Sequence, residues 1–522
     1  MTLLLKRKYQ FILILLGFLF CSVYAESYTI TKVDYNISGI SKEQFVDQKV
    51  HISRKSVFNS EEELKKYIAE LKQRYINLRL FDEVTVEYEK GDVVSSKPAD
   101  SADNVENEEI VGVTLKVSVT DSSNFIAFPY YKYSSDDGHV VKVKMQNTNF
   151  CGTLNPFESE LYFSFKQNDD TDKFDFKFGG IGAYSLPFKI GPVNASWDNE
   201  IDLSYTISKD VPEWDGSTGL SLSLPFEWIS YDLVLKQKFL NDFDNDVFDD
   251  RLSFGEYVQF AVPITLKKIS GWGDIKYTPS VSYTYYWKPH GEINIRNDAL
   301  ISPELLFSNG ISADLINWNG NFRKGVEFFI RQDIGYNYRL NDMVIGFEGE
   351  FKGHYSWDYN GISLRLYGFS YLNKNMPVGI YIRGVRNEKL FPATTPLYDI
   401  NSTSTPGAVV LNLDFPIHLM NFDFDKIGIH FLSKFNSEIQ IVPFIDFALT
   451  KNRVTGRDFS IKDGFYTAGI EFIAYPHKFK SLQVRASAGF DMGRILLKDI
   501  IDESWRPKVS KYEISLGVGL HY

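Results

Sequence analysis

The sequence predicts an all-β transmembrane barrel of about 16 antiparallel strands, preceded by one small α+β domain. Three observations support this fold class. Aromatic residues make up 16% of the chain, although its mean hydropathy is slightly polar at -0.20. Apolar and polar residues alternate over most of the chain, and the alternation ends on a terminal aromatic, Tyr522. Barrel strands alternate in this way, whereas a membrane helix needs about 20 consecutive apolar residues.

Residues 1–25 are predicted to be a signal peptide. Basic residues at 6–8 precede an apolar run at 11–20, and Ala25 lies where a signal peptidase would cleave. An uncleaved anchor helix is the alternative, which the short apolar run and the polar residues after it disfavour. Cleavage leaves Cys151 as the single cysteine, so neither a disulfide framework nor a thiolate metal site is expected.

Residues 27–121 are predicted to form the small α+β domain. The strongest helix spans 61–77, where apolar residues such as Leu64, Ile68 and Leu71 fall at helical spacing. Ser60 can cap this helix, and three glutamates fill its positive first turn. The other expected elements are a weak helix at 41–50 with Ser41 as its cap, strands at 28–33, 81–88 and 111–119, and a disordered Pro/Ser/Asp/Glu-rich insertion at about 95–109.

Residues 125–522 are predicted to form the barrel, because the hydrophobic period changes to two from Phe125 onward. A membrane barrel must close, since an open edge in lipid leaves backbone groups unpaired. The stretch 291–321 is ambiguous, because it keeps no clean alternation. The clearest alternating segments are 160–166, 173–178, 220–224, 362–366 and 482–489.

The N-terminal domain resembles a POTRA domain, the periplasmic domain of the outer-membrane barrel assembly factor superfamily. The resemblance lies in the β-α-α-β-β order and in the phrase Phe81-Asp82-Glu83-Val84-Thr85-Val86 after the second helix. The family usually has Gly-Tyr-Phe before the valine strand, and this chain has Arg79-Leu80-Phe81 instead. The sequence indicates one such domain only.

The barrel resembles the same superfamily at separate places. Its first hairpin ends in Asn149-Phe150-Cys151-Gly152, similar to the family's Asn-Phe-x-Gly turn. Tyr381-Ile382-Arg383-Gly384-Val385 lies in a long loop between strands that end near Leu372 and begin near Gly407. It resembles the Val/Ile-Arg-Gly-aromatic motif of the family's sixth extracellular loop, which folds back into the barrel. The resemblance implies that Ile382, Arg383 and Gly384 form a loop-lock motif.

A second motif implies a partner for this arginine. Phe444-Ile445-Asp446-Phe447-Ala448 resembles the family's Phe-x-Asp-x-Gly strand, so Phe444 and Asp446 form the partner motif and Arg383 is expected to contact Asp446. An arginine in a confined lumen needs a carboxylate, and a bidentate pair would hold the loop. The alternative is that Arg383 and Asp446 are unrelated lumen charges. The strand 410–417 keeps only the polar and Pro-aliphatic positions of another family strand.

The last strand is predicted to run to Tyr522, with its apolar residues on one face. Strands of this kind end bacterial outer-membrane barrels, pair with the first strand and carry the insertion signal, here assigned to Ser515, Gly517, Leu520 and Tyr522. Glycine packs little, so Gly517 and its neighbour Gly519 are expected to weaken the seam with the first strand, at about 125–134.

These features predict an insertion, assembly or translocation factor rather than an enzyme, with its barrel in the cell outer membrane and the POTRA domain in the periplasm. The expected partners are unfolded outer-membrane proteins or a passenger protein, outer-membrane lipid and periplasmic accessory proteins. The net charge of -11 argues against nucleic acid. No catalytic residue, cofactor or metal site is expected, since the eight histidines show no HExxH spacing.

Two other functions stay open at this point. One is a secretion transporter for a passenger protein, although such transporters usually carry two POTRA domains and a plug helix. The other is a surface porin or adhesin whose N-terminal domain is a periplasmic anchor.

Overall fold

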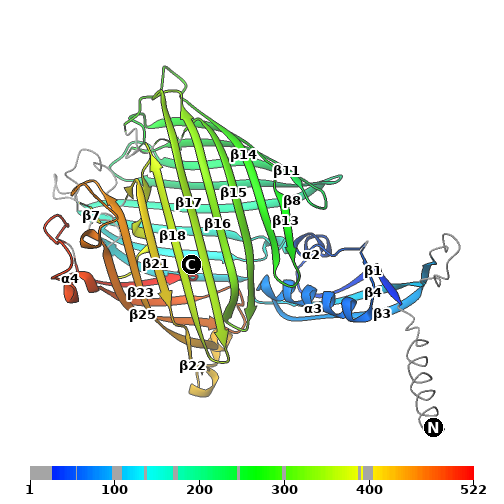
Figure 1. The fold of residues 1–522 in the computed structure, drawn as a ribbon. Helices are drawn as coiled ribbons and strands as arrows, with labels where there is room; N and C mark the ends of the chain where they lie inside the picture. Colours follow the sequence, from blue (N-terminus) through cyan, green and yellow to red (C-terminus); the bar gives the residue numbers. More distant parts are fainter. Residues whose placement is uncertain are drawn as a thin grey trace, which may run out of the picture.

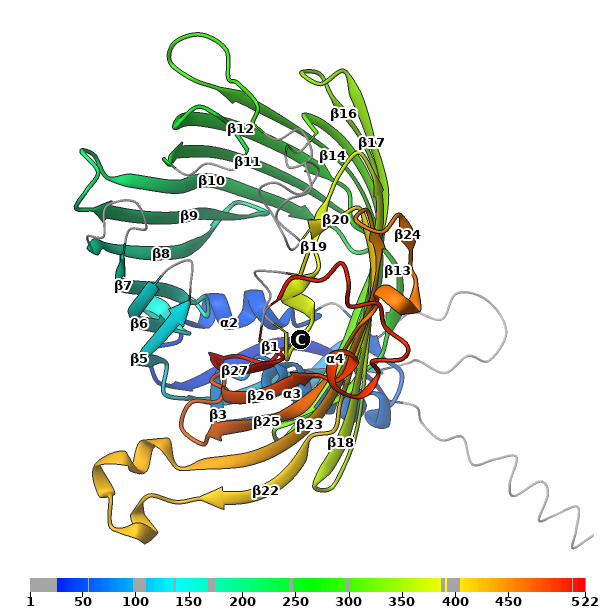
Figure 2. The same ribbon diagram turned by 90° about the vertical axis from the view of Figure 1, so that its left-hand side faces the viewer.

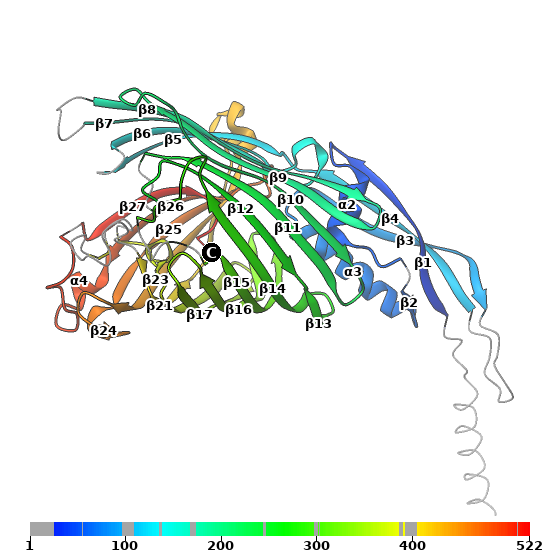
Figure 3. The same cartoon turned by 90° about the horizontal axis from the view of Figure 1, so that it is seen from above.

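The computed structural model contains a small N-terminal α+β domain followed by a large antiparallel β-barrel (Figure 1). The N-terminal domain lies beyond one end of the barrel, and helix α4 (Met492–Leu496) lies at the opposite end (Figure 3). No helix in the described part of the chain is long and apolar enough to cross a membrane. The structure describes residues 26–54, 56–96, 109–134, 138–167, 174–243, 247–296, 301, 303–385, 390–391, 404–508 and 510–521. The signal-peptide prediction and most of the predicted insertion at 95–109 fall outside these residues.

The N-terminal domain consists of a four-stranded sheet with two helices. The sheet order is β2-β1-β4-β3, in which β1 runs parallel to β4 and β3 runs antiparallel to it. The predicted strands lie within longer ones. The elements are β1 (Ser27–Ser38), α2 (Glu43–Val50), β2 (Val57–Phe58), α3 (Glu61–Asn77), β3 (Phe81–Ser96) and β4 (Glu109–Asp121).

Helix α3 has the bounds that the sequence predicts. The Ser60 hydroxyl accepts from the Glu63 N–H at 3.2 Å, and the Glu63 carboxylate accepts from the Asn59 N–H at 2.8 Å, which together form a reciprocal cap. Helix α2 is shorter than expected, because it begins after Lys42 and Ser41 does not cap it. The Ser41 hydroxyl instead donates to Asp121 at 2.6 Å, at the end of β4.

The barrel strands follow one another around a ring in chain order (Figure 2). Each strand is antiparallel to its paired neighbours. They are β5 (Phe125–Ser134), β6 (Gly138–Asn147), β7 (Phe157–Gln167), β8 (Phe174–Ile190), β9 (Val193–Thr206), β10 (Glu213–Pro225), β11 (Ser230–Asn241), β12 (Leu252–Ala261), β13 (Ile264–Ile269), β14 (Gly273–Trp287), β15 (Leu305–Asn319), β16 (Phe322–Asn337), β17 (Asp342–Trp357), β18 (Asn360–Leu372), β21 (Gly407–Asp414), β22 (Ile417–Phe422), β23 (Ser437–Asn452), β24 (Arg457–Asp458), β25 (Phe465–Pro476), β26 (Val484–Asp491) and β27 (Tyr512–Val518).

Some of these strands are parts of one interrupted strand. Both β12 and β13 pair with β14, and both β21 and β22 pair with β23, with prolines at the breaks. With two-residue β24 set aside, the described residues form eighteen continuous strands, compared with the predicted count of about 16. Strand β15 lies inside the ambiguous stretch 291–321, and it pairs with β16 over its whole length. Its backbone pairing with β16 identifies β15 as a strand, although its side-chain pattern does not.

The inner and outer faces of the barrel differ in polarity. Along β23, buried residues alternate with partly exposed ones over nearly the whole strand. The outer surface carries many exposed large apolar side chains, among them Ile330 of β16 at 62% and Phe347 of β17 at 55% exposure. An apolar exterior around a more polar interior is typical of a barrel that is surrounded by lipid.

The seam, defined as the join between β5 and β27, differs from the other joins. The ring order brings β27 beside β5. Strand β27 pairs residue by residue with β26, and β5 pairs in the same way with β6, but in the described residues no such ladder joins β5 to β27. Among the described residues, no residue-by-residue register joins β5 to β27, although the two are neighbours in the ring order, and the Ile514 side chain of β27 is 85% exposed.

Candidate functional site

The loop between β18 and β21 folds into the barrel, as Figure 2 shows for its yellow first part. We call residues 373–406 the arginine loop. A two-residue ladder between β19 (Met376–Pro377) and β20 (Ser404–Thr405) joins its two ends. Its apolar residues Val378 and Ile382 are almost fully buried in a cluster with aromatic residues of β18 and with Ala448 of β23. This packing holds the loop against the inner wall.

Arg383 lies at the centre of the loop's contacts with the wall. Its guanidinium binds Asp446 in a bidentate manner, with Nε to Oδ2 at 2.9 Å and Nη2 to Oδ1 at 2.7 Å. The Arg383 backbone N–H also donates to Asp446 Oδ2 at 2.9 Å. The guanidinium carbon lies 3.9 Å from the centre of the Phe444 ring. Arg383 is 6% exposed and Asp446 0%, so the contact is shielded from water.

Two further carboxylates surround the same guanidinium. Arg383 Nη2 donates to Asp414 of β21 at 2.6 Å, and Nη1 lies 3.4 Å from Glu471 of β25. Arg485 of β26 forms an ion pair with Glu471 at 3.4 Å. Buried charges are tolerated when they are paired in good geometry, and removing one partner is strongly destabilising. The cluster therefore depends on both arginines for its charge balance.

Gly384 extends the arginine loop across the last strands. It has a φ of +80°, and a Cβ on Gly489 of β26 would lie 2.7 Å from its Cα. Glycine at both positions lets the two backbones approach each other this closely. The Gly384 N–H then donates to Glu513 Oε2 of β27 at 2.8 Å. Through residues 383 and 384 the loop thus contacts β21, β23, β25, β26 and β27.

The structure brings the predicted loop-lock and partner residues together, which are Ile382, Arg383, Gly384, Phe444 and Asp446. Their functional role stays a prediction. Sequence reasoning did not single out Asp414, Glu471, Arg485 or Glu513 as site residues. A usable signal existed, because each charge occupies a polar position between two apolar residues and so lies on the face opposite to them.

The predicted terminal strand departs from expectation at its end. Ser515 and Gly517 lie in β27, but the strand ends at Val518, and Gly519 has a φ of +89°. That left-handed backbone turns the chain inward, so that Leu520 packs against a cluster of Val442, Ile473 and Tyr475. Leu520 therefore does not continue the outward apolar face of β27, because a positive φ breaks the alternation. Tyr522 lies outside the described residues.

Arg79 connects the N-terminal domain to the barrel. It stands directly after helix α3, with a φ of +54°. Its guanidinium donates to the backbone carbonyls of Lys480 at 2.7 Å and Gly320 at 3.0 Å, and to the Asn321 side chain at 2.9 Å. It also lies 4.1 Å from the centre of the Trp318 ring. Burial lowers the pKa of the Arg79 guanidinium to about 10, because desolvation disfavours its charged form.

A second contact fixes the other side of this domain. Asp121 accepts from the Ile40 N–H at 2.7 Å and the Ser41 N–H at 2.9 Å. Asn149, in the turn after β6, donates to the Ser41 hydroxyl at 2.7 Å. A Cβ on Gly152 would lie 2.0 Å from the Ile40 carbonyl oxygen, so this turn requires glycine. The turn that resembles the family motif therefore docks against the N-terminal domain.

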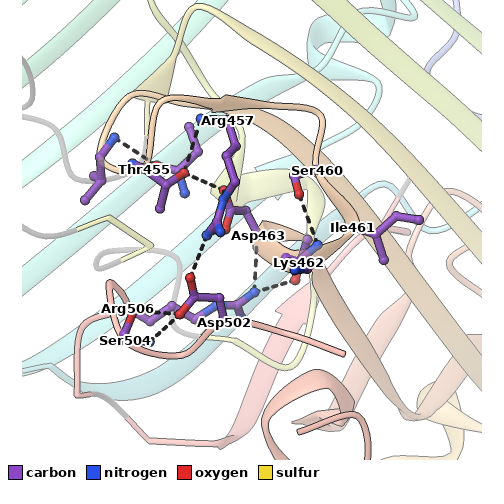
Figure 4. Close-up of polar contacts among 12 residues, drawn as sticks. Thr455, Arg457, Ser460, Ile461, Lys462, Asp463, Asp502, Ser504 and Arg506 are labelled. Carbon is purple, nitrogen blue, oxygen red and sulfur yellow. Dashed lines mark hydrogen bonds and ion pairs between the residues drawn. The ribbon is translucent and has the colours of Figure 1, made fainter. Parts of the chain in front are cut away.

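Polar contacts also join the loops at the opposite end of the barrel (Figure 4). Arg457, in the loop between β23 and β25, donates to Asp463 at 3.0 Å and to Asp502 at 2.7 Å. Asp502 lies between β26 and β27, and its backbone N–H donates to the Lys462 carbonyl at 2.8 Å. The connections around the last strands are thus held together at this end as well. Within the described residues, no group of three or more His, Cys, Asp or Glu side chains could hold a metal ion.

Comparisons with known proteins give the following likenesses. No protein-family model matches the chain, and no curated protein sequence matches it. CdiB from Acinetobacter baumannii is similar in structure over 94% of this chain and 73% of its own, with a TM-score of 0.43 and 10% identity. BamA from Haemophilus ducreyi lacking POTRA domains 1-3 is similar over 94% and 85%, with a TM-score of 0.34 and 11% identity. CdiB from Escherichia coli is similar over 96% and 91%, with a TM-score of 0.37 and 6% identity.

Proposed function

We propose that this protein is an outer-membrane insertion, assembly or translocation factor for other proteins, and that it carries out no chemical reaction. The proposal rests on how strand β27 is held at the seam. In the part of the chain that the structure describes, no residue-by-residue ladder joins β27 to β5, whereas the arginine loop contacts β27 from inside the barrel. An unpaired strand edge is a template for another strand. An unpaired strand edge in lipid leaves backbone groups without hydrogen-bond partners, so we expect a protein that keeps such an edge to use it in its function.

In this proposal the N-terminal domain is a POTRA domain that captures clients. Strand β3 stands at the end of the sheet order and pairs only with β4 in the described residues, so its outer edge is available. An extended client segment adds to such an edge through main-chain hydrogen bonds, which give affinity without strict sequence choice. The clients are unfolded outer-membrane proteins, or a passenger protein in the translocation form of the proposal.

The barrel then supplies the second step. A client strand pairs at the β5 edge of the seam and moves into lipid with its backbone groups satisfied. The contacts of Arg383 and Gly384 join β21, β23, β25, β26 and β27, so this wall keeps its shape while the seam opens. The arginine loop therefore acts as a brace for the seam, and no proton or electron is transferred.

The test is depletion of the protein in its host, followed by quantitative proteomics of the outer membrane. Loss of a set of other barrels, with those clients accumulating in the periplasm, supports insertion. An unchanged set of barrels with one missing exoprotein supports translocation. If neither the barrels nor the exoproteins change, the proposal is wrong, and a porin or adhesin function is left. Re-expression of Asp446→Ala should fail to rescue, whereas Asp34→Ala, which removes an exposed ion pair with Lys32, should rescue fully.

A further inference from the structure

We infer that the N-terminal domain holds the seam together at its own end of the barrel, with Arg79 as the positioning residue. The contacts responsible reach the turn 477–483, which connects β25 to β26. Arg79 Nε donates to the Lys480 carbonyl at 2.7 Å, and the Ser123 N–H donates to the Lys478 carbonyl at 2.8 Å. The Lys478 ammonium lies 3.8 Å from Asp82. We call these three contacts the clasp.

The clasp bridges the seam without using its last strand. Ser123 precedes β5 by two residues, and Lys478 lies in the turn that leads into β26. In the ring order, β27 stands between β26 and β5. The Ser123–Lys478 hydrogen bond therefore sets the spacing of β26 and β5 across the position of β27. Strand β27 fills this space, although no residue-by-residue ladder joins it to β5 among the described residues.

The same turn and the same cluster also hold the end of β27. The Gly519 N–H donates to the Gln483 carbonyl at 2.8 Å, three residues after Lys480. Leu520 packs against the cluster of Val442, Ile473 and Tyr475, and Trp318 packs against that cluster too. Arg79 lies over Trp318 and 6.0 Å from the Tyr475 ring centre. Arg79 and the end of β27 thus contact the same turn, 477–483, and the same apolar cluster.

Two costs at Arg79 indicate that its position is under functional constraint. A non-glycine residue with a φ of +54° is in a sparsely populated backbone region. Its guanidinium is half-buried against carbonyl and amide oxygens, and no ion pair joins it to a carboxylate among the described residues. Backbone strain and a partly desolvated charge without a direct carboxylate partner persist only where the surroundings over-determine them. Glycine would avoid both costs, and it would also remove the clasp contact.

The inference gives the N-terminal domain a role in gating, and in that respect it rests on the proposed function of the seam. A client that binds the β3 edge and turns the domain pulls Arg79 from the turn 477–483. The end of β27 then loses the support of that turn, and β5 is freed from β26. The domain therefore couples client capture to seam opening.

The test measures the seam directly by pulsed electron paramagnetic resonance on the full chain in lipid nanodiscs. Spin labels at Ala127→Cys and Leu516→Cys, in a Cys151→Ser background, report the distance between β5 and β27. Labels at Val258→Cys and Phe347→Cys report the barrel wall away from the seam. Labels at Lys66→Cys and Phe347→Cys report the position of the N-terminal domain.

We expect Arg79→Gly to raise the fraction of long seam distances by about tenfold, the effect of losing hydrogen bonds to a charged group. Glycine suits the positive φ, so the wall pair should stay unchanged and report a folded barrel. Leu520→Ala should lengthen the seam distances without moving the domain. The matched control Arg74→Gln, at an exposed arginine in the last turn of α3, should change neither.

Two results would overturn the inference. One is a displaced domain with unchanged seam distances in Arg79→Gly, since the clasp would then not act on the seam. The other is an unchanged domain position in that variant, since Arg79 would then not hold the domain. These distances require no client, so a failure of the proposed function in the depletion experiment leaves this test intact.

Discussion

Arg383, which is buried, and Arg79, which is half-buried, are stabilised by different kinds of partner. Arg383 is surrounded by Asp446, Asp414 and Glu471, so its charge is compensated by carboxylates. Arg79 is held by backbone carbonyls and an amide, which supply dipoles but no opposite charge. A charge paired with carboxylates resists displacement more strongly than one held by dipoles. Arg383 is thus suited to a permanent brace, and Arg79 to a contact that can be released.

The first residue-scale prediction concerns Asp446. Asp446→Ala removes three hydrogen bonds from Arg383 and leaves a buried charge short of its main partner. We expect a loss of about 3–5 kcal/mol in the free energy of unfolding. Asp34→Ala, at an exposed ion pair with Lys32, should cost less than about 1 kcal/mol. Heat-dependent unfolding in detergent, followed by gel mobility, measures both. Equal midpoints for the two variants would contradict the expectation.

The second residue-scale prediction concerns pH and Glu61. Hydrogen bonds from Lys65, Lys90 and Tyr88 lower the pKa of the Glu61 carboxyl to about 2. Because the folded pKa lies below the ordinary value of 4.5, the stabilisation is present above pH 4.5. It is lost as the pH falls from 4.5 towards 2. Hydrogen exchange of α3 should be faster in Glu61→Gln than in the parent chain at pH 6, and the ratio should approach one at pH 2.5. A ratio independent of pH would refute this.

At the scale of elements, β27 is held mainly by contacts other than those with its seam neighbour. It pairs along its length with β26, its Glu513 accepts from the arginine loop, and its end turns inward at Gly519. The contacts of Arg457 tie the connection between β26 and β27 to the loop before β25. These contacts join the wall from β21 to β27, so in the proposed function the seam would open by separation of β27 from β5.

The prediction at this scale concerns the crossing of the loop over β26. A Cβ on Gly489 would lie 2.7 Å from Gly384 Cα, so Gly489→Ala must push the arginine loop away from the wall. We expect a cost of about 1–3 kcal/mol. Gly310→Ala is the matched control, since the nearest atom to a Cβ there lies 3.7 Å away. Protease sensitivity of the loop and thermal unfolding should change in the first variant only. The same change in Gly489→Ala and Gly310→Ala would show that the close approach of the arginine loop to β26 is not the cause.

At the scale of the whole molecule, the N-terminal domain is docked at two separate places. Arg79 reaches the turns around residues 320 and 480, and Asp121 orders the segment that meets the turn after β6. The Ser270 hydroxyl donates to Glu70 of α3 at a third turn. Contacts at several turns give the domain a defined orientation on the barrel mouth. Its position can therefore report on the turns that it touches.

The prediction at this scale is that Asp121 controls the junction of the two parts. Asp121→Ala removes the acceptor for the Ile40 N–H and for both donors of Ser41. We expect cleavage between the domain and the barrel by added protease to accelerate by about tenfold, because a charged acceptor of three hydrogen bonds is lost. Glu89→Ala, which removes an exposed contact with Lys116, serves as the control. If both variants are cleaved at the parent rate, Asp121 does not hold the junction.

The sequence by itself determined the local features of this protein. Helix α3 and strand β5 have the predicted bounds, since capping residues and period-two alternation are local signals. The long loop between β18 and β21 lies where the motif spacing indicates, and the structure brings Arg383 to Asp446. These features follow from residues that are near each other in the chain or from a recognisable motif.

Only the tertiary structure decided the contacts between distant segments. The backbone pairing with β16 identifies β15 as a strand. Its irregular side-chain pattern does not predict this pairing. The roles of Asp414, Glu471 and Glu513 depend on where a loop folds, and the role of Arg79 depends on turns about 240 and 400 residues further along the chain. Leu520 turns inward because the single dihedral at Gly519 is positive. Local alternation cannot encode such contacts, because it reports only which face of a strand a residue occupies and not which distant segment lies next to it.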